Sequence, residues 1–197
     1  MIATENITSI LERWLAQPPR GWRNVRVAPV DASLGAGFSA DLFFVDVAYD
    51  DGEGHHFRSL VVRQQPQTLE VVHGSSLSLQ GQMMAALDAR GDIPVPPWIG
   101  MELDPAVLGM PFLVMGKVDG RCAKQRPNFN LEGWLADMSE PARRATWANG
   151  IEAMASLARI DWRDSFSFLR QPELGAPGLD QYVGALEAWH QAAGQGR

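Results

Sequence analysis

A short glycine-rich segment is the first part of the sequence whose residue types could do chemistry. It runs Gly35-Ala-Gly37-Phe38-Ser39, between two stretches of alternating apolar residues. Glycine lets a backbone approach a ligand closely and point its amides at phosphate oxygens. No Gly-Lys-Ser/Thr follows, and the next element is a predicted strand, which excludes a P-loop and a dinucleotide-binding turn. A turn that covers nucleotide phosphates and a plain hairpin turn both fit the segment.

A cation and an amide follow the glycine-rich segment along the chain. Arg63 ends the apolar run Leu60-Val-Val-Arg63, where it could hold phosphates by bidentate contact or point into water. Gln80 lies in the next predicted helix. Its amide oxygen could accept a hydrogen bond from Arg63 and so orient the guanidinium, or the side chain could simply be solvated.

The third candidate is a strand end that we call the hinge segment, residues Met115, Gly116, Lys117 and Val118. A strand that stops at Met115 and bends at Gly116 can offer backbone N–H and C=O groups to a flat heterocycle. Met115 would add a soft apolar contact to such a ligand. A plain linker between two domains is the alternative.

The elements that must position these residues change in type along the chain. The spacing of apolar residues predicts strands and helices up to about residue 117 and helices only after it. We therefore expect an α+β fold with a boundary between domains 1–117 and 118–197, the first an antiparallel five-stranded sheet packed against a helix. The expected helices cover about 5–17, 76–90, 130–138, 139–159 and 179–193, and the expected strands 25–30, 43–49, 57–63, 98–101 and 111–115.

Composition excludes several functional classes. A net charge of −6 with no basic block argues against a nucleic-acid partner. The single cysteine, Cys122, and the absence of metal-ligand spacing predict a reducing compartment and no metal centre within the chain. No basic leader and no run of about 20 apolar residues is present, so we expect a cytoplasmic protein without a membrane partner.

The order of the motifs resembles one family over about residues 25–190. It is similar to the aminoglycoside phosphotransferase and choline kinase group, which has a protein-kinase-like fold. Within that group it most resembles bacterial phosphotransferases related to kinase-like domains attached to some acyl-CoA dehydrogenases. The matching motifs are Leu34-Gly-Ala-Gly-Phe-Ser39, Val61-Val-Arg63, Gln80-Gly-Gln-Met-Met-Ala-Ala-Leu87, Ile93-Pro-Val-Pro96, Leu108-Gly-Met-Pro-Phe-Leu-Val-Met115 and Val118-Asp-Gly-Arg121.

The resemblance implies a role for each candidate residue. It implies an ATP- or GTP-dependent transfer of the γ-phosphate to a small-molecule hydroxyl, with Mg²⁺ as the metal. In the nucleotide-binding N-lobe, Gly35, Gly37, Phe38 and Ser39 would cover the phosphates. Arg63 would contact the α- and β-phosphates, and Gln80 would orient it. Met115, Gly116, Lys117 and Val118 would hold the base.

The sequence departs from the family where transfer should occur. The family's catalytic loop is His-Gly-Asp with a nearby Asn, and an Asp of a later strand binds the metal. None of the four histidines, His55, His56, His73 and His190, is followed by Gly-Asp. We therefore assign no catalytic and no metal-binding residue to this chain, and expect the metal ligands beyond its end.

Three interpretations of the chain stay open. It could be the nucleotide-binding lobe of a phosphotransferase, followed by a partial helical C-lobe without the catalytic loop. It could be a non-catalytic interaction or regulatory module, with an apolar face covered by a partner or by a second copy in a homodimer. It could also be a fragment of a longer protein. The acceptor is not identified by the sequence: an antibiotic, a sugar, an amino alcohol and an acyl-carrier hydroxyl all fit.

Overall fold

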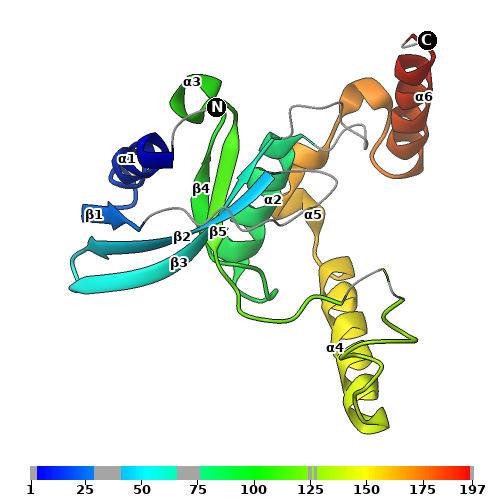
Figure 1. Cartoon of the computed structure of the whole chain (residues 1–197). Helices are drawn as coiled ribbons and strands as arrows, with labels where there is room; N and C mark the ends of the chain where they lie inside the picture. Colours follow the sequence, from blue (N-terminus) through cyan, green and yellow to red (C-terminus); the bar gives the residue numbers. More distant parts are fainter. Residues whose placement is uncertain (1–3, 29–40, 66–75, 124–125, 127, 196–197) are drawn as a thin grey trace.

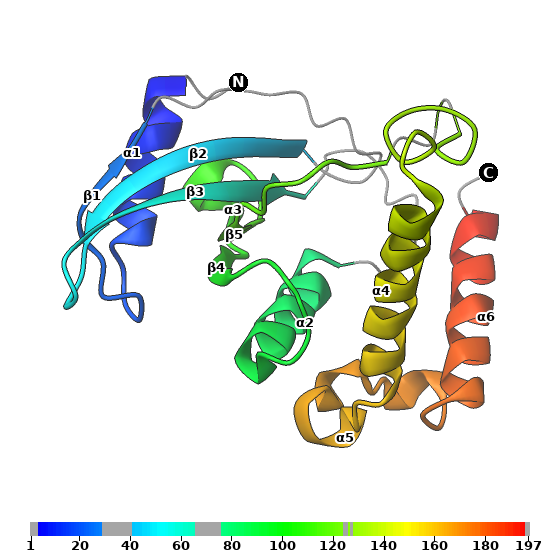
Figure 2. The same cartoon turned by 90° about the horizontal axis from the view of Figure 1, so that it is seen from below.

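The computed structural model of the chain describes residues 4–28, 41–65, 76–123, 126 and 128–195. Figure 1 shows a twisted sheet at the centre, helix α1 on one side of it and helix α2 on the other. The remaining long helices extend away from the sheet in both views (Figures 1 and 2). The sheet and the helices that cover it are therefore one packed unit, and the later helices project from it.

The sheet has five strands, and all neighbouring strands are antiparallel, as the alternation of apolar residues predicts. Their order is β1-β2-β3-β5-β4, so β3 is the central strand. The order places β5 between β3 and β4, because the chain leaves β3 through α2 before it returns at the far edge. The strands are β1 (Arg23–Val27), β2 (Asp41–Asp50), β3 (His55–Gln64), β4 (Trp98–Glu102) and β5 (Phe112–Gly116).

The main core lies between the sheet and helix α1 (Thr4–Leu15). Trp14 packs edge-on against Phe112 of β5, with ring centroids 5.0 Å apart. Burial of this apolar surface is the main stabilising term of the sheet unit. The core residues are Leu11, Trp14, Leu15, Trp22, Val25, Val27, Val45, Val47, Tyr49, Leu60, Val62, Leu108, Phe112 and Val114.

Polar contacts around Trp14 hold helix α1 against strand β4. The indole Nε1 donates to Glu102 at 3.2 Å, and the Arg20 guanidinium lies 4.1 Å above the indole ring. Arg20 Nε also donates to the Leu15 carbonyl at 3.0 Å, at the end of the helix. Burial lowers the pKa of Arg20, although Glu102 opposes that shift. Gly100 makes room for the Trp14 side chain, because a Cβ at position 100 would lie 3.2 Å from the indole ring.

Helix α2 (Leu77–Arg90) has the ends that its sequence predicts. The Ser76 side chain accepts a hydrogen bond from the Leu79 amide at 3.1 Å, and Gly91 ends the helix in the left-handed conformation. Gly81 faces strand β4, where a Cβ would meet the Met101 sulfur and the Trp98 ring. The absence of a side chain at Gly81 therefore lets α2 lie close against the sheet.

The segment after β5 contains only helices and turns among the described residues. The predicted helices are confirmed at α4 (Glu140–Ala158) and α6 (Leu179–Gln195). The predicted helix at 130–138 is wrong: the residues form turns, with Gly133 at a φ of 92°. Phe166 packs with Leu87 and Ile93 and so joins this part to α2. The other short elements are α3 (Pro105–Leu108), α5 (Trp162–Ser165), η1 (Ser167–Leu169) and η2 (Pro172–Leu174).

Helix α4 differs from α1 in its surroundings. None of its residues is buried, and its apolar residues Trp147, Ile151 and Met154 are all exposed. The same holds for the apolar stripe of α6, which includes Tyr182 and Trp189. Within the described part of the chain, no helix is long and apolar enough to cross a membrane.

Candidate functional site

The glycine-rich segment itself, with Gly35, Gly37, Phe38 and Ser39, lies outside the described residues. The structure does describe the two ends that flank it. The Ala28 amide, just after β1, donates to the Asp46 carbonyl at 2.8 Å. At the other end, Asp41 begins β2 opposite Gln64 of β3. The chain therefore returns to the sheet directly beside Arg63.

Arg63 lies on the central strand, opposite Leu42 of β2 and Leu113 of β5. Its neighbour Val62 is fully buried and belongs to the core under α1. Because successive side chains of a strand point to opposite faces, Arg63 and Val61 lie on the face turned away from α1. We call this surface the Arg63 face. Arg63 is half-buried there, in a position to present its charge to a ligand from a fixed strand.

Gln80 lies on the same side of the sheet as Arg63. The neighbouring Gly81 contacts Met101 of β4, and Met101 is in register with Leu113, which is opposite Arg63. Gln80 is half-buried on α2. The proximity that the sequence predicts for Arg63 and Gln80 is thus compatible with the fold, and the hydrogen bond between them stays a prediction.

The hinge segment is bonded to the sheet on both sides as it leaves. The Gly116 amide donates to the Pro97 carbonyl at 2.8 Å, and the Lys117 amide donates to the Ser59 carbonyl at 2.9 Å. Gly116 also packs closely on the Pro97 ring. No described residue accepts a hydrogen bond from the Val118 amide, and Val118 is exposed. Val118 is therefore the hinge residue whose N–H can bind a ligand acceptor.

An apolar surface joins the hinge segment to Arg63. Met115 is opposite Val61, and Val61 is opposite Phe44 of β2, so all three side chains share the Arg63 face. All three are half-buried. Lys117 lies at the hinge end, with its ammonium group 5.7 Å from the centre of the Phe44 ring and 3.6 Å from Asp119. The Arg63 face thus offers an apolar area between two cations.

Sequence reasoning did not assign a role to Phe44 and Val61. The signal was present, because β2 and β3 are apolar on both faces while α1 covers only one of them. Apolar side chains on the strand face that α1 does not cover are typical of a ligand-binding surface as well as of a core.

A hollow of about 550 Å³ continues the Arg63 face toward the β2–β3 turn. Its walls include Arg26, Ala48 and Phe57, and its floor holds a 2.5 Å hydrogen bond from Ser59 to Asp46. The Lys117 amide bonds to this same Ser59. The hollow therefore opens beside the hinge segment and could admit the part of a ligand that extends beyond it.

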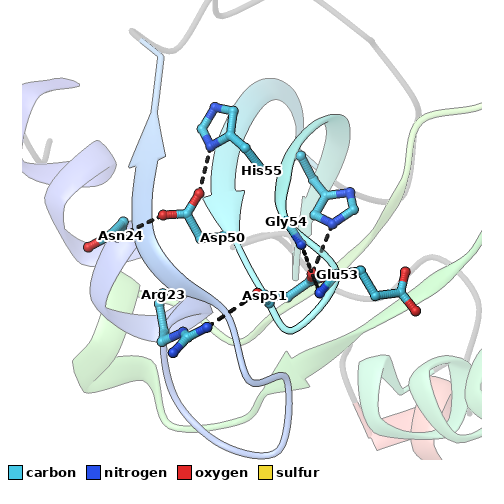
Figure 3. Close-up of polar contacts among 8 residues, drawn as sticks. Arg23, Asn24, Asp50, Asp51, Glu53, Gly54 and His55 are labelled. Atoms are coloured by element: carbon cyan, nitrogen blue, oxygen red, sulfur yellow. Dashed lines mark hydrogen bonds and ion pairs between the residues drawn. The ribbon is translucent and has the colours of Figure 1, made fainter.

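The histidines of the β2–β3 turn are bonded to aspartates at the same turn (Figure 3). His55 Nδ1 lies 2.7 Å from Asp50, and His56 Nε2 lies 2.9 Å from Asp51. Hydrogen bonds from Asn24 and then from His55 lower the pKa of Asp50. The turn is at the end of β3 opposite to Arg63. These histidines therefore bond within the hairpin turn and lie at the end of β3 far from Arg63.

The described residues contain no group of three or more His, Cys, Asp or Glu side chains that could hold a metal ion. The Arg63 face combines a cation, an apolar area and a backbone amide of the hinge segment.

Comparison with known proteins identifies the family. Residues 32–196 match the model of the phosphotransferase enzyme family. The chain belongs to this family. The resemblance of the motifs to the aminoglycoside phosphotransferase group is thereby confirmed.

One curated relative of this phosphotransferase-family chain is a longer protein. The chain is 25% identical over 130 residues to the probable acyl-CoA dehydrogenase IBR3 of Arabidopsis thaliana. The matched part is 66% of this chain and 14% of that protein. The chain thus spans a small part of the length of this relative.

Proposed function

We propose that this chain binds ATP or GTP on the Arg63 face and is the nucleotide-binding portion of a phosphotransferase. The reaction of the whole enzyme would move the γ-phosphate to the hydroxyl of a small molecule. The observation that carries the proposal is the order of groups on one sheet face: Arg63 beside the start of β2, then an apolar area, then the hinge segment.

Each part of a nucleotide has a complementary group on this face. The flat base would lie against Phe44, Val61 and Met115, which together offer an apolar area of suitable type. The Val118 amide would donate to a ring nitrogen of the base. Arg63 would bind phosphate oxygens through its planar fork of N–H donors, and it keeps its charge at any physiological pH.

Phosphate binding also involves the glycine-rich segment and Gln80. We propose that Gly35, Gly37, Phe38 and Ser39 cover the phosphates and that Gln80 orients the Arg63 guanidinium. Mg²⁺, when bound with the nucleotide, neutralises the charge of the β- and γ-phosphates. The described residues hold and orient the nucleotide, and we assign the transfer step to none of them.

A non-catalytic, kinase-like interaction module is the second candidate. The observation that favours it is the exposed apolar surface of α4 and α6. Such a module could retain or lack nucleotide binding. The nucleotide titration described below therefore tests only the proposal that the chain binds ATP or GTP.

The test is nucleotide titration of the whole chain, followed by thermal unfolding and by calorimetry. With Mg²⁺ present, ATP or GTP at 100 times its Kd should stabilise the protein by about 2.7 kcal/mol. The Arg63→Ala variant should lose about 1.5–3 kcal/mol of binding free energy, which is about 10- to 100-fold in affinity.

Arg13→Ala is the control for the titration. Arg13 is exposed on α1, the helix that packs on the opposite face of the sheet. Its removal should leave nucleotide affinity unchanged. Equal affinities for the Arg63 and Arg13 variants, or no response to millimolar nucleotide in the unaltered chain, would contradict the proposal.

A further inference from the structure

Two charged side chains lie beside the Val118 amide, and the proposed function gives neither of them a role. Lys117 belongs to the hinge segment, and Asp119 follows the segment directly. The Lys117 ammonium lies 3.6 Å from the Asp119 carboxylate and 5.7 Å from the centre of the Phe44 ring. The charge pair is therefore at the edge of the apolar area where a nucleotide base would lie.

The sheet fixes the side on which Lys117 lies. Its amide donates to the Ser59 carbonyl at 2.9 Å, which continues the pairing of β5 with β3 by one residue. Lys117 is two residues from Met115, so the two side chains share the Arg63 face. The contact of the ammonium with the Phe44 ring, on the same face, agrees with this placement. A base that lies against Phe44 would thus have the Lys117 ammonium beside it.

The charge pair is open to a ligand. The side chains of Lys117 and Asp119 are 41% and 95% exposed, and their separation of 3.6 Å is longer than a hydrogen bond. Exposed ion pairs contribute little to stability, so little is lost when a ligand takes over part of the contact. An ammonium has three donors and a carboxylate has two acceptor oxygens. The pair therefore presents a donor and an acceptor next to each other.

The Val118 amide by itself does not distinguish the two purines. It can donate to a ring nitrogen of either base, since N7 is an acceptor in both adenine and guanine. The bases differ at position 6, which carries an amino donor in adenine and a carbonyl acceptor in guanine. They also differ at N1, which is an acceptor in adenine and carries a proton in guanine. Discrimination therefore requires side chains that face position 6 and N1.

The polarity of the Lys117–Asp119 pair matches guanine. An ammonium donates to the O6 and N7 acceptors of guanine, a common way in which proteins recognise this base. A carboxylate accepts hydrogen bonds from the N1–H and from the 2-amino group of the same base. Adenine would place an amino donor against the ammonium and a lone pair against the carboxylate. The pair thus attracts one purine and repels the other, which is how charged groups produce specificity.

We propose that Lys117 and Asp119 select guanine, so that the chain binds GTP in preference to ATP. The proposal rests on the proposed function, because it requires a nucleotide on the Arg63 face with its base beside the hinge segment. Lys117 would donate to O6, and Asp119 would accept from N1–H and the 2-amino group. Both residues determine specificity, and neither takes part in phosphate binding.

The first test is calorimetric titration of the whole chain with GTP and with ATP, each in the presence of Mg²⁺. GTP should bind about 10-fold more tightly, near the lower end of the discrimination that a good side-chain contact to a base provides. Equal affinities, or tighter binding of ATP, would overturn the selection and leave nucleotide binding in place. Absence of binding for both would instead contradict the proposed function, and the selection with it.

Inosine triphosphate separates the groups of the base. Its base keeps O6 and N1–H but lacks the 2-amino group. Its affinity should therefore lie between those of GTP and ATP. An affinity no higher than that of ATP would show that O6 and N1–H are not recognised, and would overturn the proposed contacts.

Lys117→Met tests the ammonium, because methionine keeps most of the unbranched chain and removes the charge. Binding of GTP should weaken about 10-fold, to the level of ATP, and binding of ATP should not weaken. Lys117→Arg keeps a cationic donor for O6 and N7 and should retain the preference for GTP. A preference for GTP that survives Lys117→Met would overturn the role of Lys117.

Asp119→Asn tests the carboxylate, because asparagine keeps the shape and removes the charge. Charge-assisted hydrogen bonds are stronger than neutral ones, so GTP should bind about 2- to 5-fold more weakly. The difference between GTP and inosine triphosphate should shrink at the same time, which a merely structural role of Asp119 would not produce. An unchanged difference would remove Asp119 from the proposed contacts.

Arg90→Met is the matched control. Arg90 forms an ion pair with Asp92 across the same two-residue spacing, at 2.7 Å, at the end of α2. Its replacement changes the net charge by the same amount as Lys117→Met, so the ratio of GTP to ATP affinity should stay at about 10. Thermal unfolding without nucleotide checks that each variant is folded. Loss of the preference in the Arg90 variant as well would show that selection does not depend on Lys117, and would overturn the proposal.

Discussion

The sheet unit and the α4 region each contain a helix with one apolar face, but the two faces differ in burial. Helix α1 carries Leu11, Trp14 and Leu15 on one face, and all three are buried against the sheet. Helix α4 carries Trp147, Ile151 and Met154 at equivalent spacing, and all three are exposed. An apolar stripe therefore predicts a helix, but the layer that covers the stripe has to come from elsewhere in the protein.

The largest expected effect tests how self-sufficient the sheet unit is. Phe112 is 0% exposed and packs against Trp14, so Phe112→Ala should destabilise the chain by about 3–5 kcal/mol. Phe57, also on the sheet but 77% exposed, is the matched control. Its replacement by alanine should cost less than about 0.5 kcal/mol in chemical denaturation. Similar costs at the two positions would break the comparison.

The second prediction concerns the attachment of α6. Gly184→Ala forces a methyl group onto the Leu174 carbonyl and should weaken the contact between α6 and η2 by about 1–3 kcal/mol. Hydrogen exchange of the α6 amides should accelerate as a result. Gly194→Ala has open space at its Cβ and should stabilise the helix by up to about 1 kcal/mol. Unchanged exchange in the Gly184 variant would show that α6 does not depend on η2.

A third prediction, with a smaller expected effect, tests whether the hinge segment of the sheet unit binds the nucleotide. Val118→Pro removes one backbone N–H, whereas Val118→Ala keeps it. The loss of a neutral hydrogen bond of about 0.5–1.5 kcal/mol predicts nucleotide binding about 2- to 10-fold weaker for the proline variant. Calorimetric titration measures both variants. Equal affinities would remove the Val118 amide from the proposed site.

The smallest effect is a pH dependence at the β2–β3 turn (Figure 3). Hydrogen bonds from Asn24 and then His55 hold the pKa of Asp50 below its ordinary value of 3.8. Because the folded pKa is the lower one, the stabilisation is present above the unfolded value and is lost as the pH falls through the folded pKa. Asn24→Ala should raise the pKa of Asp50 toward 3.8 in a carboxyl NMR titration. No change would show that His55 alone maintains the shift.

Local signals allowed the sheet unit to be predicted in detail. Ser76 and Gly91 mark both ends of α2 in the sequence and in the structure, and the alternation of apolar residues marked β1 and β2. The position of β5 between β3 and β4 was not predictable from local signals, since it depends on contacts across the α2 connection. Helix α3 is only four residues long, so Asp104 and Pro105 gave too short a pattern to predict it.

The candidate site was predictable in its residues but not in its surroundings. The sequence indicated Arg63 and the hinge segment from their types and order, and register adds Phe44 and Val61 to the same face. The helix expected at 130–138 failed because Gly133 takes a φ of 92°, outside the helical region. Nothing local in the sequence excluded a series of turns over these residues.

Arg63 lies on a strand whose opposite face is buried in the apolar core. Behind β3, the fully buried Leu60 and Val62 belong to the core under α1, a medium that polarises far less than water. The electric field of the guanidinium is therefore directed outward from the open face, over a distance of about one Debye length. On a chain with a net charge of −6, this local positive potential would guide polyphosphate anions to one face of the sheet. Their association rate should fall as the ionic strength rises.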